Sequence, residues 1–168
     1  KFDSYAWILF MKSCQFCPPA DLSPQRIWKS RYWTMIVSRR PLNRGQVILF
    51  PNRHLTSLAK LSAQEARALF LATNRVARLL VRRYRISGWQ LLVNNGRSAG
   101  QSIPHIHFHF IPRYNPERRS PLLPLVSRKA YRELRALTST QIQTVARSLR
   151  IALKKKPWQI FYLDVEYR

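Results

Sequence analysis

Three of the chain's four histidines stand at alternate positions in one short apolar stretch. His105, His107 and His109 are separated by Ile106 and Phe108. Because side chains alternate between the two faces of a strand, the three imidazoles are predicted to share one face. Such a row suits a zinc site or a nucleophile with its phosphate partners. Chance is a poor explanation, since a core histidine is normally single, but the row alone does not choose between metal and nucleophile.

The two cysteines are a second candidate for chemistry. Cys14 and Cys17 are the only cysteines in the chain, which excludes a disulfide scaffold. A Cys-x-x-Cys pair in a chain of 168 residues indicates metal ligands or a redox pair. Two free thiols are the plainest alternative.

Strands and helices must position these residues, and the order in which they are predicted along the chain indicates one α+β domain on an antiparallel sheet. Alternating, β-branched and aromatic stretches predict strands over residues 32–37, 46–50, 89–93 and 103–111. A hairpin turn is expected between the first two strands and another turn at Asn94–Gly96. The segment up to about Arg31 is expected to be irregular.

Two helices are predicted. The first begins at a capping box, Ser62 with Glu65, and carries apolar residues at helical spacing as far as Leu80. Its other face is rich in arginine. The second covers residues 138–153 and precedes the basic run 154–156.

Composition bounds the function classes. The chain has 30 Lys and Arg against 7 Asp and Glu, a formal net charge of +23. Since 46% of its residues are hydrophobic, intrinsic disorder is unexpected. No apolar run approaches the ~20 residues of a membrane span. The excess charge predicts a polyanionic partner such as nucleic acid, whereas a solvated enzyme surface usually mixes both signs.

The sequence around the histidines resembles the histidine triad (HIT) family, in particular its bacterial branch of diadenosine-polyphosphate-hydrolase-like proteins that contain zinc. Three landmarks carry the resemblance in the right order: GQVILFPNRH at residues 45–54, NNG at 94–96 and AGQSIPHIHFHFIPRY at 99–114. The resemblance covers roughly residues 14–114. It implies a HIT-like fold with an antiparallel sheet of about five strands and two helices.

The resemblance also implies a nucleotidyl hydrolase or transferase that cleaves a phosphoanhydride or phosphoramidate at the α-phosphate. His107 would be the nucleophile that forms a nucleotidyl-histidine, with its ring oriented by the backbone carbonyl of His105. His109 would hold phosphate oxygens, and Ser102 would lie near the leaving-group oxygen. Further substrate or phosphate contacts are expected from Asn94, Gln101, Gly100, Ser38 and Gln46.

In the zinc-containing branch the same landmarks supply metal ligands, here Cys14, Cys17, His54 and His105. Four nitrogen and sulfur ligands make a closed structural zinc site, so Zn²⁺ would organise the fold and do no chemistry. It would join the segment around the cysteines to the catalytic strand.

Two departures from the family pattern bear on substrate binding. Gln46 occupies a position where the family often has histidine near the active site. Ser38 stands about where an acidic residue commonly binds the ribose hydroxyls. Both changes leave the nucleophile in place and put the details of nucleotide binding in doubt.

The alternative function is a basic HIT-fold subunit that binds RNA or DNA, with or without catalysis, possibly within a ribonucleoprotein. Aprataxin-like deadenylases rank third, because their extra C-terminal zinc finger is not found in these residues. A homodimer is a further possibility, as is a cytoplasmic or, after removal of a leader, an organelle-matrix location. We divide the chain into residues 1–31 with the cysteine pair, a core over 32–114, and a basic Pro- and Arg-rich segment with helix and tail over 115–168.

Overall fold

Five strands form one antiparallel sheet in the computed structural model, which describes residues 14–115 and 133–154. The order across the sheet is β1-β2-β3-β5-β4. The strands are β1 (Arg26–Lys29), β2 (Trp33–Val37), β3 (Val47–Pro51), β4 (Gly88–Val93) and β5 (Phe108–Arg113). The helices are α2 (Ala63–Tyr84) and α5 (Ser139–Lys154), with short 3-10 turns η1 (Leu58–Lys60) and η2 (Arg97–Ala99). This is the α+β architecture that the sequence predicts.

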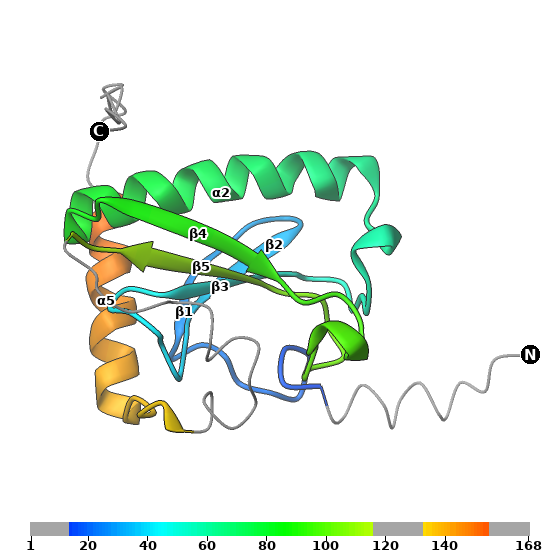
Figure 1. Cartoon of the computed structure of the whole chain (residues 1–168), viewed down its shortest axis with the longest axis horizontal. Coiled ribbons are helices and arrows are strands. Elements are labelled where there is room, and N and C mark those ends of the chain that lie inside the picture. The colour runs from blue at the N-terminus through cyan, green and yellow to red at the C-terminus, as the bar shows by residue number, and fades with distance from the viewer. Residues whose placement is uncertain (1–13, 116–132, 155–168) are drawn as a thin grey trace, which may run out of the picture.

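Different parts of the chain pack on the two faces of the sheet. Both helices lie on one face (Figure 1), where Met35, Leu49 and Phe110 of the central strands join Leu79 and Leu149 of the helices in the main core. The opposite face carries a smaller cluster of Ile36, Ile48 and Phe50, against which Phe16 and Leu22 pack. Alternate residues of β2 and β3 therefore enter different clusters, as period-two side chains must. The smaller cluster lies on the face that also holds the histidines.

The start of α2 is fixed by side chains near its first turn. Ser62 accepts from the backbone N–H of Glu65, and the Glu65 carboxylate accepts from the backbone N–H of Ser62, which completes the predicted capping box. The same carboxylate accepts from Arg53 at 2.9 Å. Arg53 stands next to His54, so this ion pair joins the start of α2 to the chain that leaves β3.

Most predicted elements agree with the structure to within about two residues, but two expectations are wrong. The segment up to Arg31 is not irregular throughout, because β1 pairs with β2 and buries Ile27. The last strand does not run over 103–111 but begins at Phe108 and ends at Arg113. Pro104 has no N–H for a ladder, and the N–H of Ile106 donates to the carbonyl of Leu55, outside the sheet.

Some expectations fall outside the described residues: most of the Pro- and Arg-rich stretch after Pro112, and the tail that follows Lys154. The division into three segments stays a prediction. Among the described residues, no helix combines the length and the apolar character that crossing a bilayer requires.

Candidate active site and metal centre

His107 lies directly before β5 and is 5% exposed. Its Nδ1 is 2.8 Å from the backbone carbonyl oxygen of His105. A carbonyl oxygen only accepts hydrogen bonds, so Nδ1 must carry the proton. The Nε2 atom of the neutral ring then carries the lone pair that could attack an electrophile. The ring of Phe16 stands edge-on to this imidazole, with centroids 5.3 Å apart, and restricts how the ring can tilt.

His109 lies two residues further along the chain, within β5 and opposite Ile48 of β3. The centroids of the His107 and His109 rings are 5.0 Å apart. Gln46 sets the tautomer of His109. The side-chain oxygen of Gln46 accepts from the backbone N–H of Leu42 at 2.6 Å, which fixes the orientation of the amide. The amide nitrogen is therefore 3.3 Å from Nδ1 of His109 and donates to it. The proton of neutral His109 consequently resides on Nε2, the nitrogen that could donate to a phosphate oxygen.

Burial keeps both rings neutral. It lowers the pKa of His107, although the hydrogen bond to the His105 carbonyl acts in the opposite direction. Burial, with a smaller contribution from the charge on His107, lowers the pKa of His109 to about 3. A neutral His107 is a competent nucleophile, and a neutral His109 with Nε2–H is a hydrogen-bond donor.

The other predicted substrate residues occupy two places. Asn94, Gly100, Gln101 and Ser102 belong to the connection between β4 and β5. Gln101 is 9% exposed and uses its amide to organise this connection: the oxygen accepts from the N–H of Gly96, and the nitrogen donates to the carbonyls of Thr56 and Ile103. Gly100 has a φ of +83°, which favours glycine, and Ser102 is exposed.

Ser38 directly follows β2 and is 1% exposed; its backbone N–H donates to the carbonyl of Gln46. The contacts of Ser38 and of the residues between β4 and β5 with a nucleotide stay predictions. Among the predicted substrate residues in the described part of the chain, Gln46 is the one whose side chain contacts a predicted catalytic side chain, that of His109.

Four side chains from three separate parts of the chain form a compact cluster of sulfur and nitrogen atoms. One ligand atom each from Cys14, Cys17, His54 and His105 lies within 4.8 Å of all the others. Nδ1 of His105 is 3.5 Å from both sulfurs, and Nδ1 of His54 is 3.3 Å from the sulfur of Cys17. A tetrahedral zinc ion with ordinary bond lengths separates its sulfur and nitrogen ligands by about 3.6 Å. The cluster therefore fits a zinc ion.

The chemistry of the donors supports the same fit. Nε2 of His105 is 2.9 Å from the carbonyl oxygen of Pro51 and must donate to it, so Nδ1 of this ring has its lone pair toward the sulfurs. Burial lowers the pKa of His105 to about 4 and so favours the neutral, ligating form. Burial and the neighbouring Cys14 raise the pKa of the Cys17 thiol to about 12. A cation beside this sulfur would oppose that effect and favour the thiolate, which is the form that binds zinc.

His105 links the candidate metal centre to the candidate nucleophile. Its ring faces the cysteines, while its carbonyl oxygen accepts the proton of His107. Phe16, between the two cysteines in sequence, stacks on Phe50 and meets the rings of both His105 and His107 edge-on. The sequence analysis missed Phe16, whose only signal is an aromatic residue inside the Cys-x-x-Cys pair.

Comparison with known proteins gives the following matches. A family model described as the HIT domain matches residues 22–116. A bis(5'-adenosyl)-triphosphatase of Saccharomyces cerevisiae is 31% identical over 94 residues, 55% of this chain and 46% of the relative. A nitrilase and fragile histidine triad fusion protein of Caenorhabditis elegans is 28% identical over 103 residues, 61% of this chain and 23% of the relative. The chain thus spans less than half the length of either relative.

Among solved structures, a Zn-bound histidine triad family protein from Mycobacterium smegmatis superposes with a TM-score of 0.66 at 24% identity. The match covers 85% of this chain and 94% of that one. At this identity the likeness concerns the fold, and it confirms the sheet and helix arrangement described above.

Proposed function

Because the chain belongs to the HIT domain family, whose domain its residues 22–116 match, we propose that it is a nucleotide hydrolase acting at an α-phosphate through His107. The observation that carries the proposal is the 2.8 Å contact between Nδ1 of His107 and the carbonyl oxygen of His105. It assigns the proton to Nδ1 and leaves Nε2 as a buried, neutral nucleophile. The similarity to a bis(5'-adenosyl)-triphosphatase supports a phosphoanhydride as the substrate.

The proposed reaction has two displacements at phosphorus. In the first, the lone pair of His107 Nε2 forms a bond to the α-phosphorus, and the bond from phosphorus to the bridging oxygen breaks. The leaving phosphate departs with that electron pair and is protonated by solvent, while Ser102 would hydrogen-bond the leaving-group oxygen, as the family resemblance implies. In the second, a water oxygen attacks the α-phosphorus, loses a proton and releases His107, which yields a nucleoside monophosphate.

The surrounding groups stabilise the charges of these steps. While Nε2 of His107 is bonded to phosphorus, the ring is cationic, and the carbonyl of His105 accepts the shared proton of its Nδ1–H. His109 donates from Nε2 to a non-bridging oxygen, where negative charge is concentrated. We assign Asn94, Gln101 and Gly100 to the phosphates and Ser38 to the ribose, as the family resemblance implies.

We also propose that Cys14, Cys17, His54 and His105 hold a structural Zn²⁺. When bound, a closed four-ligand zinc site supplies cross-linking of the fold and leaves no open coordination position for substrate. The residues of this chain do the rest: the His105 carbonyl orients His107, and Phe16 packs over both rings. That a zinc-bound protein shares the fold supports this assignment.

The test compares the full chain with its His107→Ala variant. Diadenosine triphosphate, diadenosine tetraphosphate and adenosine phosphoramidate are incubated with each protein, and the products are separated by ion-exchange chromatography. We expect hydrolysis of at least one substrate and a loss of more than a thousandfold in the variant, because no other described side chain supplies the nucleophile. Asn74→Ala, an exposed change on α2, serves as the control and should retain activity.

Two outcomes would reject the proposal: turnover of none of the three substrates by metal-loaded protein, or equal turnover by wild type and His107→Ala. Quenching in alkaline detergent, in which a phosphorus–nitrogen bond to histidine survives, should trap labelled nucleotide on the wild-type chain alone. The homodimer and the cellular location stay predictions of the sequence.

A further inference from the structure

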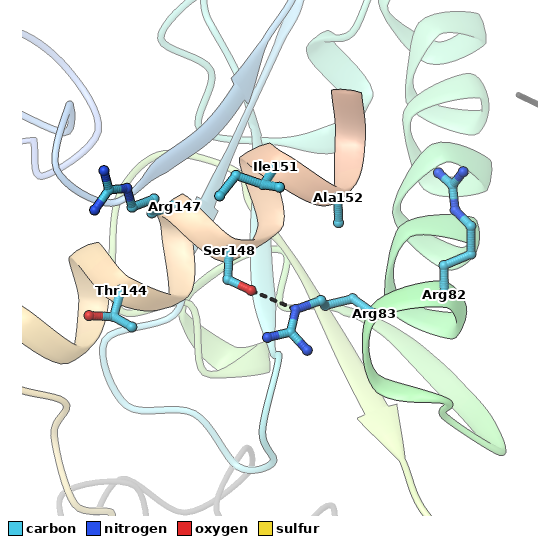
Figure 2. Close-up of a pocket in the computed structure, with 7 residues that line it drawn as sticks. All are labelled: Arg82, Arg83, Thr144, Arg147, Ser148, Ile151 and Ala152. Atoms are coloured by element: carbon cyan, nitrogen blue, oxygen red, sulfur yellow. Dashed lines mark hydrogen bonds between the residues drawn. The ribbon is translucent and has the colours of Figure 1, made fainter. Parts of the chain in front are cut away.

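A hollow of about 580 Å³ opens between the C-terminal end of α2 and the middle of α5 (Figure 2). Arg82 and Arg83 line it from α2, and Arg147 lines it from α5. Thr144 and Ser148 add hydroxyl groups from α5. Arg83 reaches across the hollow and donates from Nε to the Ser148 hydroxyl, as the dashed line in Figure 2 shows. Cationic groups thus come from both helices, and the hydroxyl groups come from α5.

The hollow lies within a larger basic surface. The basic residues of the two helices are Arg67, Arg75, Arg78, Arg82, Arg83, Arg147, Arg150 and Lys154. The only carboxylate on either helix is Glu65, at the far end of α2, where Arg53 engages it. Arg67, Arg78 and Arg82 point within about 60° of one another at 100° per residue, on the exposed face of α2. The positive charge therefore has no compensating carboxylate on these helices.

Helix capping accounts for only part of this arrangement. Cations in the last turn of a helix compensate the partial negative charge of its carbonyls, which explains Arg82 and Arg83. Arg147 and Ser148 stand in the middle of α5, away from both of its ends, so capping does not explain them. An anion in the hollow would explain both sets at once, because guanidinium and hydroxyl groups together are the usual ligands of phosphate oxygens.

This surface is separate from the candidate active site. Phe108 and Phe110 of β5 pack in the helix-side core with Leu79 and Leu149, whereas His109 stands opposite Ile48, in the cluster on the other face. The sheet therefore lies between the hollow and the histidines. A ligand in the hollow cannot be the phosphate that His107 attacks, and substitutions there should leave dinucleotide hydrolysis unchanged.

We propose that the hollow between α2 and α5 binds the phosphodiester backbone of a single nucleic-acid strand. Arg82, Arg83 and Arg147 contact phosphates, with Thr144 and Ser148 donating hydrogen bonds. The strand continues along the exposed arginines of α2, where Arg67 and Arg82 are about 22 Å apart at 1.5 Å per residue, long enough for several consecutive phosphates. This goes beyond the proposed hydrolysis, which needs none of these residues.

The shape of the site favours a strand over a lipid surface. A bilayer is flat and would contact the crests of the helices, whereas the three arginines line the two walls of a concave site. A polynucleotide backbone is narrow enough to enter and presents evenly spaced charges. The exposed Ile151, which also lines the hollow, offers an apolar surface for a sugar or a base.

The experiment measures binding of the full, metal-loaded chain to fluorescein-labelled U20 and T20 oligonucleotides by anisotropy between 50 and 200 mM KCl. Both should bind, since the contacts are to phosphates. Each phosphate contact with a single strand contributes about −0.7 to the slope of log K against log salt. The triple variant Arg82→Gln, Arg83→Gln, Arg147→Gln should therefore have a slope shallower by about 2. Its loss of affinity over this fourfold salt range should be roughly 20-fold smaller than that of wild type.

A matched triple variant removes the same charge away from the proposed path of the strand: Lys29→Gln, Arg31→Gln, Lys60→Gln. All three residues are exposed; Lys29 ends β1, Arg31 lies in the turn between β1 and β2, and Lys60 ends η1. The control should keep most of the salt dependence, and equal effects of the two triple variants would overturn the site. The proposal would also be overturned if neither oligonucleotide bound at 50 mM KCl. The same holds if the triple variant of Arg82, Arg83 and Arg147 weakened binding to vesicles of phosphatidylglycerol and phosphatidylcholine more than binding to U20.

Further measurements test whether unfolding of a variant, and not the loss of a phosphate contact, causes its weaker binding. Arg82→Gln with Arg147→Gln leaves the bond from Arg83 to Ser148 intact and should reduce the slope by about 1.4. Thermal unfolding and diadenosine triphosphate hydrolysis should match wild type in every hollow variant. A double variant with normal unfolding and an unchanged slope would overturn the proposal.

Discussion

Replacing Gln46 by Glu exchanges one nitrogen for one oxygen beside His109. In the native protein the amide oxygen of Gln46 accepts from Leu42, and its nitrogen donates to Nδ1 of His109 over 3.3 Å. A glutamate keeps the first bond and reverses the second, because a carboxylate has no proton to donate. Nδ1 of His109 must then carry a proton. The ring becomes either an imidazolium or the neutral tautomer with its lone pair at Nε2.

The magnitude follows from the separation. Two unit charges 3.3 Å apart attract by about 5 kcal/mol at an effective dielectric constant of 20. One pKa unit corresponds to 1.36 kcal/mol, so the carboxylate can raise the pKa of His109 by about 3.5 units. In the native protein that pKa is lowered to about 3 by burial. The variant should therefore titrate at His109 around pH 6 to 7.

The assay is long-range ¹H–¹⁵N NMR of protein with labelled histidines, with pH profiles of hydrolysis in parallel. Wild-type His109 should show a protonated Nε2 and an unprotonated Nδ1 from pH 5 to 9. In Gln46→Glu, Nδ1 should be protonated throughout. Above pH 7, kcat/KM should fall by roughly 10- to 100-fold, because a hydrogen bond to a charged phosphate oxygen is worth about 1.5–3 kcal/mol and its donor has been lost.

Asn43→Ala is the matched control, since Asn43 lies in the same turn and donates to the carbonyl of Pro112, not to His109. It should lower the thermal stability while leaving the His109 tautomer and the pH profile unchanged. A wild-type spectrum with the proton of His109 on Nδ1 would refute the assignment of Gln46 as the residue that sets this tautomer. The same conclusion would follow if Gln46→Glu left the spectrum of His109 unaltered.

Three further predictions concern stability. The Arg53 guanidinium and the Ser62 hydrogen bonds lower the pKa of Glu65 in the folded protein. The ionised carboxylate therefore stabilises the fold above the unfolded-state pKa of about 4.3, and this contribution disappears as the pH falls through the lower folded-state pKa. Glu65→Gln, which can still complete a capping box, should cost about 1 kcal/mol in urea unfolding at pH 7 and nothing near pH 2; a cost independent of pH would contradict this. Gly45→Ala should cost about 2–4 kcal/mol, because φ is +85° and the new Cβ would stand 2.6 Å from the ring of Tyr84. Gly96→Ala, with a φ of +96° and open space, should cost only about 1–2 kcal/mol, and equal costs would exclude the clash. Purified protein should contain about one zinc per chain by elemental analysis. A chelator should lower the unfolding temperature by about 5–10 °C, because the fold would lose about 2.7 kcal/mol of stabilisation by the bound ion. The Cys17→Ser variant should contain little zinc, and its unfolding temperature should not respond to the chelator.

The sequence by itself determined features whose causes act over a few residues. The alternation of His105, His107 and His109 with apolar residues indicated an extended stretch, because the side-chain period of an extended chain is two, and β5 begins within this stretch at Phe108. The capping box of Ser62 and Glu65 located the start of α2 to the residue, because its hydrogen bonds span only three positions. The Cys-x-x-Cys pair indicated metal ligands on the same local ground.

Short or distorted elements gave weaker local signals. β1 is a strand of four residues, and its pairing with β2 shifts register between Arg26 and Trp28. Two of its four residues are basic, which hides the alternation. The start of β5 depends on Leu55, which takes the N–H of Ile106 away from the sheet. Neither feature can be deduced from a window of neighbouring residues.

The tertiary structure alone decided the tautomer of His109 and the separation of the surfaces. Gln46 and His109 are 63 positions apart, and Cys14 and His105 are 91 apart, yet each pair is in direct contact. Which nitrogen of an imidazole carries the proton depends on whether a donor or an acceptor lies within about 3.5 Å of the other nitrogen. Strand register and loop packing set that distance. Residue types thus determined which chemistry was available. The tautomer of His107 follows from a carbonyl two positions away, whereas the tautomer of His109 follows from long-range packing.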